Sequence, residues 1–211
     1  MQELEAQFLA SGGQYKEYKL GDLFVKIQPK MQIKNKKYKV SDLPKAPTDE
    51  CNLPMITACG TNQGISCFAP KNDFTVLKNI ISLSANGMPV CFYQPREFGI
   101  LQDAYAIAYK KANLKNNQAD LQKQADKKKE GETEGVELSA LAQLYLVSCI
   151  SKVITGNFNW NNKSGWVKVK EQIISLPTKN NDIDISFMEA YITELEIERL
   201  MELQAYLSQK A

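Results

Sequence analysis

The C-terminal segment constrains the fold most, because it predicts one long helix whose apolar residues cannot all face a single surface. Ser186 and Glu189 have the spacing of a capping box, and the helical pattern continues to about Ser208. The apolar residues form two stripes: Met188, Tyr191, Ile192 and Leu195, then Ile197, Leu200, Met201 and Leu207. Such a helix favours pairing with a partner helix, and packing wholly against its own domain is the alternative. The expected partner contacts are Met188, Tyr191, Ile192, Leu195, Leu200 and Met201.

Residues 14–176 indicate a mixed, mainly β body, because short apolar runs alternate with turn residues. Strands are expected at residues 18–27 (broken at Gly21), 53–58, 65–68, 79–84, 89–93, 104–109 and 166–176. Asn86-Gly87 is the strongest hairpin signal, and we interpret it as turn geometry rather than as a contact. Apolar residues at helical spacing predict a buried helix over residues 138–154. Together with the terminal helix, these patterns predict an α+β fold.

Segments of different composition flank and interrupt this body. Residues 1–13 predict the last turns of a helix, with Leu4, Phe8 and Leu9 on its apolar side and Ser11-Gly12-Gly13 at its end. Residues 177–184 are expected to be a linker, so that residues 177–211 form a separate helical unit. Residues 30–52 predict a loop, and the polar residues 110–136 predict an inserted or partly helical surface segment.

The composition excludes several kinds of enzyme. The chain has no histidine, which removes Ser–His and Cys–His catalysis and most zinc sites. Its five cysteines are scattered without a CxxC pair, as expected for reduced thiols in the cytoplasm. No apolar run approaches the ~20 residues that span a bilayer, and no glycine-rich nucleotide loop is present. A magnesium site made only of carboxylates stays open, but no such cluster stands out, so we expect no catalytic residue, metal or cofactor in this chain.

Charge is distributed unevenly along the chain, although the net charge is only +2. Residues 26–39 contain six lysines and no acid, whereas residues 182–202 contain seven acids and one basic residue, Arg199. This asymmetry suits a body that faces DNA and a terminal helix that is turned away from phosphate. Phosphate contacts are expected at Lys30, Lys34, Lys36, Lys37 and Lys39; ordinary solvated loop lysines are the alternative.

Base edges are read by amides, hydroxyls and arginine, and such side chains gather at three places. The candidates are Thr57, Thr61, Asn62 and Gln63 on one predicted turn, Gln94 and Arg96 after the hairpin, and Asn161 and Lys163 on a polar, aromatic loop. For Arg96 the alternative is a surface ion pair. For the two tryptophans near this loop, core packing is the favoured interpretation.

Several short motifs, taken in order, resemble a known family. Lys19-Leu20-Gly21-Asp22-Leu23-Phe24 follows an aromatic residue, and residues 53–57 are followed by Asn62-Gln63-Gly64-Ile65. Residues 81–87 and 91–94 form the hairpin, and residues 174–177, 182–184 and 187–189 lead into the terminal helix. This order resembles the target-recognition domain of the specificity (S) subunit of type I restriction–modification systems. Residues 110–136 have no counterpart in that pattern.

The resemblance implies a half-length specificity subunit, with residues 1–13 similar to the end of a spacer helix, residues 14–176 to the DNA target-recognition domain and residues 177–211 to the conserved helix. It implies double-stranded DNA, a DNA methyltransferase subunit and a restriction subunit as partners. S-adenosylmethionine would bind the methyltransferase, and the chain itself would be non-catalytic. Two copies would form a homodimer through an antiparallel, coiled-coil-like helix pair. The rival interpretations are a scaffold protein that assembles through its terminal helix and a nuclease with an unrecognised site.

Overall fold

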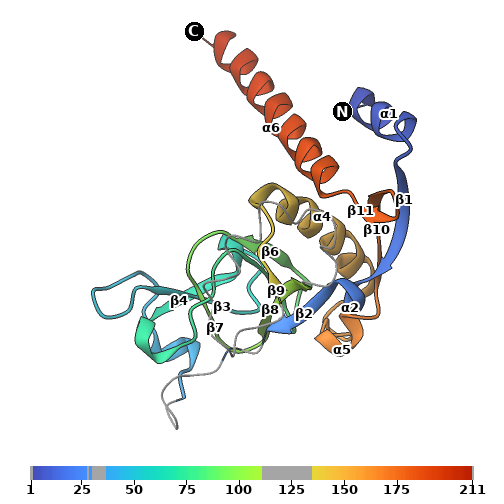
Figure 1. Ribbon diagram of the computed structural model, residues 1–211. Coiled ribbons are helices and arrows are strands. Elements are labelled where there is room, and N and C mark those ends of the chain that lie inside the picture. The colour runs from blue at the N-terminus through green and yellow to red at the C-terminus, as the bar shows by residue number, and fades with distance from the viewer. Residues whose placement is uncertain (1, 28, 30–36, 111–134, 211) are drawn as a thin grey trace, which may run out of the picture.

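The computed structural model of the protein describes residues 2–27, 29, 37–110 and 135–210 (Figure 1). A five-stranded sheet contains β2 (Phe24–Ile27), β8 (Ala104–Lys110), β5 (Ile80–Ser84) and β6 (Cys91–Gln94) in that order, with β9 (Gly135–Val136) on β8. A second sheet has the order β4 (Ile65–Ala69), β3 (Leu53–Ile56), β7 (Gly99–Ile100), and a third the order β1 (Gln14–Lys19), β10 (Ile173–Lys179), β11 (Asp182–Ile183). The helices are α1 (Gln2–Ala10), α2 (Leu20–Leu23), α4 (Ala140–Asn157), α5 (Trp166–Val169) and α6 (Ile185–Ser208).

Helix α4 forms the centre of the main core. Ser139 caps its first turn by accepting from the Ala142 amide, and Leu146, Ile150 and Ile154 are fully buried. These side chains pack with the apolar face of the five-stranded sheet and with the start of α6 (Figure 1). The buried helix expected at residues 138–154 is therefore confirmed, with its end at Asn157.

The local strand signals are confirmed where the turn chemistry was strong. β5 and β6 pair antiparallel on either side of the turn that holds Gly87, whose φ is +76°. β3 and β4 pair antiparallel around the turn at residues 57–64, with a register shift between Met55 and Ile56. The expected helix at the N-terminus is also present; it ends at Ala10, and Gly12, with a φ of +87°, turns the chain after it. A smaller core under β3 and β4 joins Leu43, Leu53, Met55, Cys67, Ala69 and Phe74.

The expected linker at residues 177–184 is wrong. β10 continues through Pro177 to Lys179 and turns at Asn180 and Asn181, which both have positive φ, into β11. β10 pairs with β1, at the other end of the chain, from Ile173 to Thr178. Likewise, the strand-like run expected from residue 166 begins with the short helix α5. The pairing of β10 with β1 is non-local, and so local sequence patterns could not reveal it.

Helix α6 begins at a different cap from the one expected. The Asp184 carboxylate, not the Ser186 hydroxyl, accepts from the Phe187 amide at 2.9 Å. The Phe187 ring packs on Phe8 of α1, with 4.1 Å between the ring centroids. The Glu189 side chain accepts from Ser139, so the expected capping box is wrong and this carboxylate links α6 to the cap of α4.

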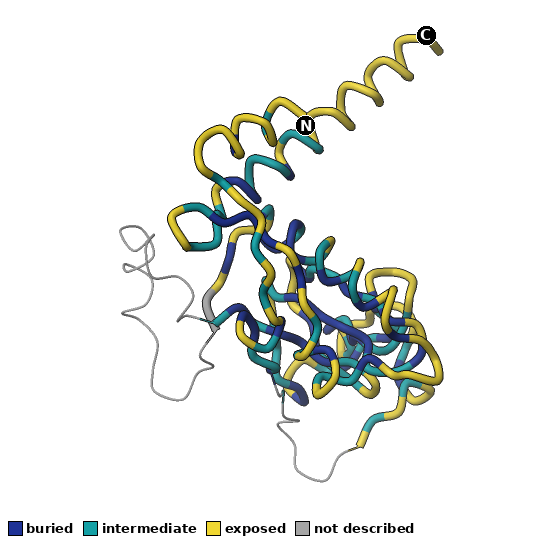
Figure 2. The backbone as a smooth tube through the Cα atoms, turned by 90° about the vertical axis from the view of Figure 1, so that its right-hand side faces the viewer, coloured by how far each residue is buried: buried dark blue, intermediate teal, exposed yellow. Residues whose placement is uncertain are grey.

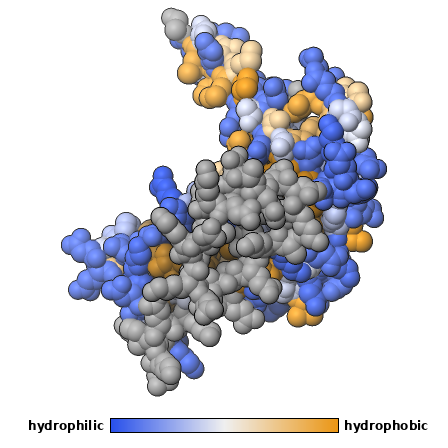
Figure 3. Space-filling view, viewed as in Figure 1, coloured by the Kyte–Doolittle hydropathy of each residue, from blue (hydrophilic) through white to orange (hydrophobic). Residues whose placement is uncertain are grey.

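The two apolar stripes of α6 have different surroundings. Met188 and Ile192 are buried, and Tyr191 and Leu195 pack beside them against the body, so these four expected partner residues are covered within the chain. The distal half extends away from the body and is exposed (Figure 2). Its exposed apolar residues are Ile197, Leu200, Met201, Leu203, Tyr206 and Leu207. We call these residues the distal stripe; its aliphatic members and Met201 belong to the orange surface on the free end of α6 (Figure 3). No helix among the described residues is long and apolar enough to cross a membrane.

The cap of α6 can be tested with a pair of substitutions. Asp184→Ala should lower the free energy of unfolding by about 1 kcal/mol, because the Phe187 amide loses its acceptor. Ser186→Ala should change it by less than about 0.5 kcal/mol, since Ser186 is exposed and caps nothing. Denaturant unfolding followed by circular dichroism measures both. Equal losses from the two variants would contradict the assignment of the cap.

Candidate nucleic-acid interface

The turn between β3 and β4 has an unusual backbone. Asn62, Gln63 and Gly64 have φ values of +47°, +51° and +85°, so three successive residues are left-handed. For non-glycine residues this conformation costs roughly 1–2 kcal/mol each, and such strain often marks functional loops. The side chains of Thr61, Asn62 and Gln63 are all exposed. The turn thus presents two amides and one hydroxyl to solvent on a bent backbone.

Thr57 has a different position from the other turn candidates. Its hydroxyl is half-buried and hydrogen-bonds Ser66 on β4 at 2.5 Å. Its backbone amide donates to the Gly64 carbonyl at 3.0 Å and closes the turn. Thr57 therefore holds the base of the turn, whereas Thr61, Asn62 and Gln63 form its exposed end.

Gln94, expected to face DNA, lies underneath the turn. Its side chain is 4% exposed, and Nε2 donates to the Gln63 carbonyl at 2.8 Å and to Ser82 Oγ at 3.0 Å. The sequence places Gln94 after the hairpin as a DNA contact, whereas in the structure its amide is directed inward, to the turn. A buried amide needs hydrogen-bond partners, and those of Gln94 join the left-handed turn to the five-stranded sheet, which we call the central sheet.

Arg96 is exposed on the segment between β6 and β7. No ion pair joins it to another residue of the described chain, whereas its neighbour Glu97 pairs with Lys71 at 2.7 Å. The described residues therefore do not supply the surface ion pair that was the alternative for Arg96.

The lysine run is only partly described. Lys30, Lys34 and Lys36 lie outside the described residues, and Lys37 and Lys39 are exposed. Lys45 was missed by the sequence interpretation. Its ammonium donates to the Ser66 carbonyl at 3.2 Å, next to the Thr57 hydroxyl. The Phe68 amide of β4 donates to the carbonyl of Pro44, the residue before Lys45, at 2.9 Å. This contact is non-local, so no local signal in the sequence could indicate it.

The loop that follows α4 carries the remaining candidates. Asn161 and Lys163 are exposed, as is Trp160, with 71% of its surface accessible. The favoured interpretation of core packing is therefore wrong for Trp160. Trp166, in contrast, is half-buried and packs on Tyr105 with 6.1 Å between ring centroids.

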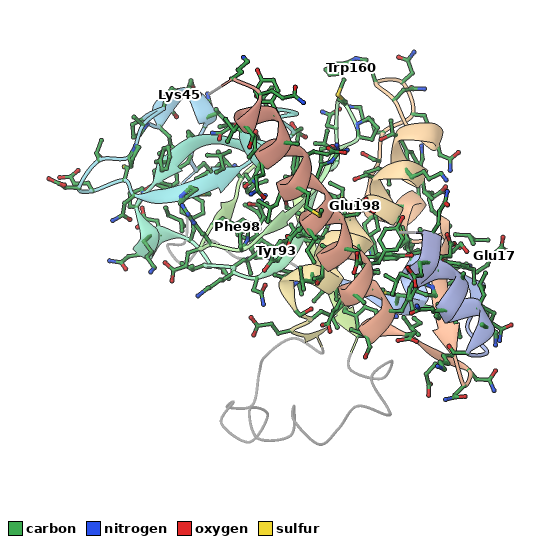
Figure 4. All side chains as sticks on the ribbon, turned by 90° about the horizontal axis from the view of Figure 1, so that it is seen from above. Glu17, Lys45, Tyr93, Phe98, Trp160 and Glu198 are labelled. Atoms are coloured by element: carbon green, nitrogen blue, oxygen red, sulfur yellow. The ribbon has the colours of Figure 1, made fainter. Side chains whose placement is uncertain are left out.

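Three loops join into one surface. A Cβ atom added at Gly60 would lie 3.7 Å from the Met88 sulfur, and one added at Gly87 would lie 3.3 Å from the Trp160 ring. Figure 4 shows Lys45 and Trp160 at the same edge of the molecule, away from Glu17. We call this the loop surface; it comprises Lys45, Thr61, Asn62, Gln63, Met88, Trp160, Asn161 and Lys163.

Two thiols near the turn have opposite surroundings. Hydrogen bonds to Thr61 lower the pKa of Cys59, and burial raises the pKa of Cys67. Within the described ranges, no three histidine, cysteine, aspartate or glutamate residues gather as a metal site would require. The loop surface presents amide, hydroxyl and ammonium groups, and two apolar side chains, Met88 and Trp160.

Comparison with known proteins identifies the fold. No protein-family model matches the chain, and no curated protein sequence matches it. Its structure is similar to the crystal structure of a type I restriction–modification system S subunit from M. genitalium, with a TM-score of 0.52 and 17% sequence identity. The match covers 91% of this chain and 41% of that one. The expected α+β fold, with mixed sheets and a long C-terminal helix, is confirmed, and it is a fold shared with an S subunit.

The strain in the turn can be measured. Gln63→Gly should raise the free energy of unfolding by about 0.5 kcal/mol or more, because the left-handed strain it relieves exceeds the entropic cost of glycine. Gln14→Gly, in the extended strand β1, should instead be destabilising. Denaturant unfolding of the two variants tests this, and a loss of stability in Gln63→Gly would show that the turn is not strained.

Proposed function

We propose that the chain is a sequence-specific, double-stranded DNA recognition subunit of a restriction–modification enzyme and is itself non-catalytic. The observation that carries this proposal is the exposed left-handed turn, which Gln94 fixes to the central sheet. Amide and hydroxyl groups of Thr61, Asn62 and Gln63 can donate to and accept from base edges. The similarity of the fold to an S subunit supports the same function.

Different side chains position the protein on the duplex and read the bases. Lys37, Lys39 and Lys45, with Lys30, Lys34 and Lys36 of the same run, contact phosphates and set the position on the duplex. The turn and Arg96 read base edges, and Asn161 and Lys163 contact the duplex from the adjacent loop. Gln94 and Thr57 act through the turn rather than on DNA directly.

Partner chains carry out the catalysis. A DNA methyltransferase subunit binds S-adenosylmethionine and is directed to the target by this chain, and a restriction subunit can join the same assembly. The described residues offer a second surface for assembly, because the distal stripe leaves large apolar side chains exposed.

The distal stripe suits a second copy of the chain. α6 has 24 residues and is therefore about 36 Å long, and only its first half packs on its own body. Two such helices paired antiparallel around a two-fold axis would place two loop surfaces at opposite ends. The DNA target would then consist of two inverted half-sites with a fixed spacer.

Substitutions of the base-reading residues and of the phosphate-contacting lysines should have different effects on DNA binding. Asn62→Ala and Gln63→Ala should relax the ranking of single-base variants of the target, because each lost base contact removes about 1–3 kcal/mol of discrimination. Replacing Lys34, Lys36 and Lys37 together by Ala should weaken binding to all sequences, lower the salt dependence and keep the ranking. Gel-shift titrations at several salt concentrations, with competitor duplexes, measure both effects.

A matched control replaces Lys16, Lys179 and Lys210 by Ala, since Lys16 and Lys179 lie on β1 and β10 at the opposite end of the body. This variant should keep both affinity and ranking. A protein that retains no duplex at low salt would be the scaffold of the rival interpretation. One that cuts DNA with magnesium and no partner would be a nuclease.

The assembly can be tested on the distal stripe. Leu200→Glu combined with Met201→Glu should convert a dimer into a monomer, because two exposed apolar contacts become charged. Val167→Glu combined with Ile173→Glu places the same charges on exposed apolar residues outside α6 and should leave the dimer intact. Light scattering of the free chain, and of its complex with the methyltransferase, gives the oligomeric state. A wild-type chain that is monomeric in both conditions would contradict the proposed dimer.

A further inference from the structure

Two large apolar side chains of the loop surface are strongly exposed and lie on neighbouring loops. Met88 is 70% exposed and Trp160 is 71% exposed. Gly87, which precedes Met88, lies directly beside the Trp160 ring, so the loops that carry the two side chains are in contact. Figure 4 shows Trp160 projecting from the edge of the molecule. Exposed apolar patches of this kind mark binding surfaces more often than isolated exposed residues do.

The loop that carries Trp160 is held by hydrogen bonds. The Asn159 side chain accepts from the backbone amides of Asn161 and Asn162, both at 2.9 Å. The Asn162 side chain donates to the Asn157 carbonyl at 2.9 Å. At the other end of the loop, the Ser164 carbonyl accepts from the buried Tyr105 hydroxyl at 2.9 Å. Trp160 is therefore presented on a fixed support, which lowers the entropy lost when it binds.

Ser84 ties the Met88 loop to the Trp160 loop. Its hydroxyl donates to the Met88 carbonyl at 2.6 Å and accepts from the Val90 amide at 3.0 Å. Its carbonyl accepts from the Ser164 hydroxyl at 2.8 Å. Ser84 and Ser164 are both almost completely buried, so this link is part of the core rather than of the surface.

The charge around this pair favours a nucleic acid over an apolar protein surface. Residues 157–170 contain three lysines and no acid, and the Lys168 ammonium donates to Asn162 at 2.7 Å. On its other side Met88 adjoins the turn that exposes Asn62 and Gln63. The distal stripe, by contrast, lies in an acidic segment. Apolar side chains in basic, amide-rich surroundings suit the stacked bases of DNA.

We propose that Met88 and Trp160 form an apolar contact site for the faces of nucleobases, next to the base edges that the turn reads. The inference rests on the proposed function, because it assumes that the loop surface faces DNA. A base face is accessible only where neighbouring bases are partly unstacked, so the pair enters the duplex at a deformable step such as a pyrimidine–purine step. The site adds discrimination through the cost of deforming DNA, not through hydrogen bonds.

The chain contains two tryptophans, which makes the test direct. In a Trp166→Phe variant, Trp160 is the sole source of tryptophan fluorescence. The probe is the 30-bp duplex that the protein retains from a random pool at low salt. Binding should shield Trp160 from acrylamide and lower the quenching constant about threefold or more. 2-Aminopurine placed along the retained duplex should brighten at one step with wild-type protein and not with Trp160→Ala.

Affinity for the retained duplex gives the second readout. Trp160→Ala should bind roughly tenfold more weakly, whereas Trp160→Phe should keep most of the affinity because a smaller ring still stacks. Ile173→Ala removes an apolar side chain that is 52% exposed on β10, outside the loop surface and the distal stripe, and should leave affinity unchanged. Thermal unfolding of each variant separates a lost contact from a lost fold.

The outcomes distinguish the two proposals. If no duplex is retained, both the proposed function and this inference fail. If the duplex is retained but Trp160 stays equally accessible to acrylamide, the function stands and the inference is overturned. If the methyltransferase alone shields Trp160 and DNA does not, the patch is a protein-binding site and the inference is again overturned.

Discussion

The packing of α4 between the central sheet and α6 is the contact on which the rest of the structure depends. Its fully buried side chains, among them Leu146 and Ile150, join the sheet, β10 and the start of α6 into one core. Because α4 covers one side of β5 and β6, the turns at the ends of these strands are held rigidly. The loop surface is built on those turns, and α6 is oriented by the same helix. The loop surface and α6 therefore share one support.

Local sequence signals predict much of the fold. The features that they do not predict depend on contacts between distant parts of the chain. Turn chemistry at residues 60–64 and at Gly87 correctly predicts two hairpins, and apolar periodicity correctly predicts α4 and α6. The third sheet was missed because β1 and β10 are separated by most of the chain. The sequence cannot decide between Ser186 and Asp184 as the cap of α6, because both are good capping residues and the end of β11 at Ile183 decides between them.

In the candidate site, too, the sequence predicts some features and leaves others undetermined. Residue types identify Asn62 and Gln63 as exposed polar groups, but cannot tell an amide that faces solvent from one that supports a turn, as Gln94 does. Trp160 was assigned to the core because tryptophan is usually buried, yet the hydrogen bonds of its loop hold it outward. Lys45 joins the site through non-local hydrogen bonds between its own segment and β4. Side-chain direction, rather than residue identity, is what the sequence leaves undetermined.

The central claim is that this surface reads a DNA sequence, and selection from a random duplex pool tests it most directly. The purified chain is incubated with random 30-bp duplexes, alone and together with the methyltransferase subunit proposed as its partner, and the retained fraction is sequenced. The account predicts an enriched motif at low salt, retention that falls steeply as salt rises, and loss of the enrichment in Gln63→Ala. Retention without any enriched motif, or no retention in either condition, would contradict it.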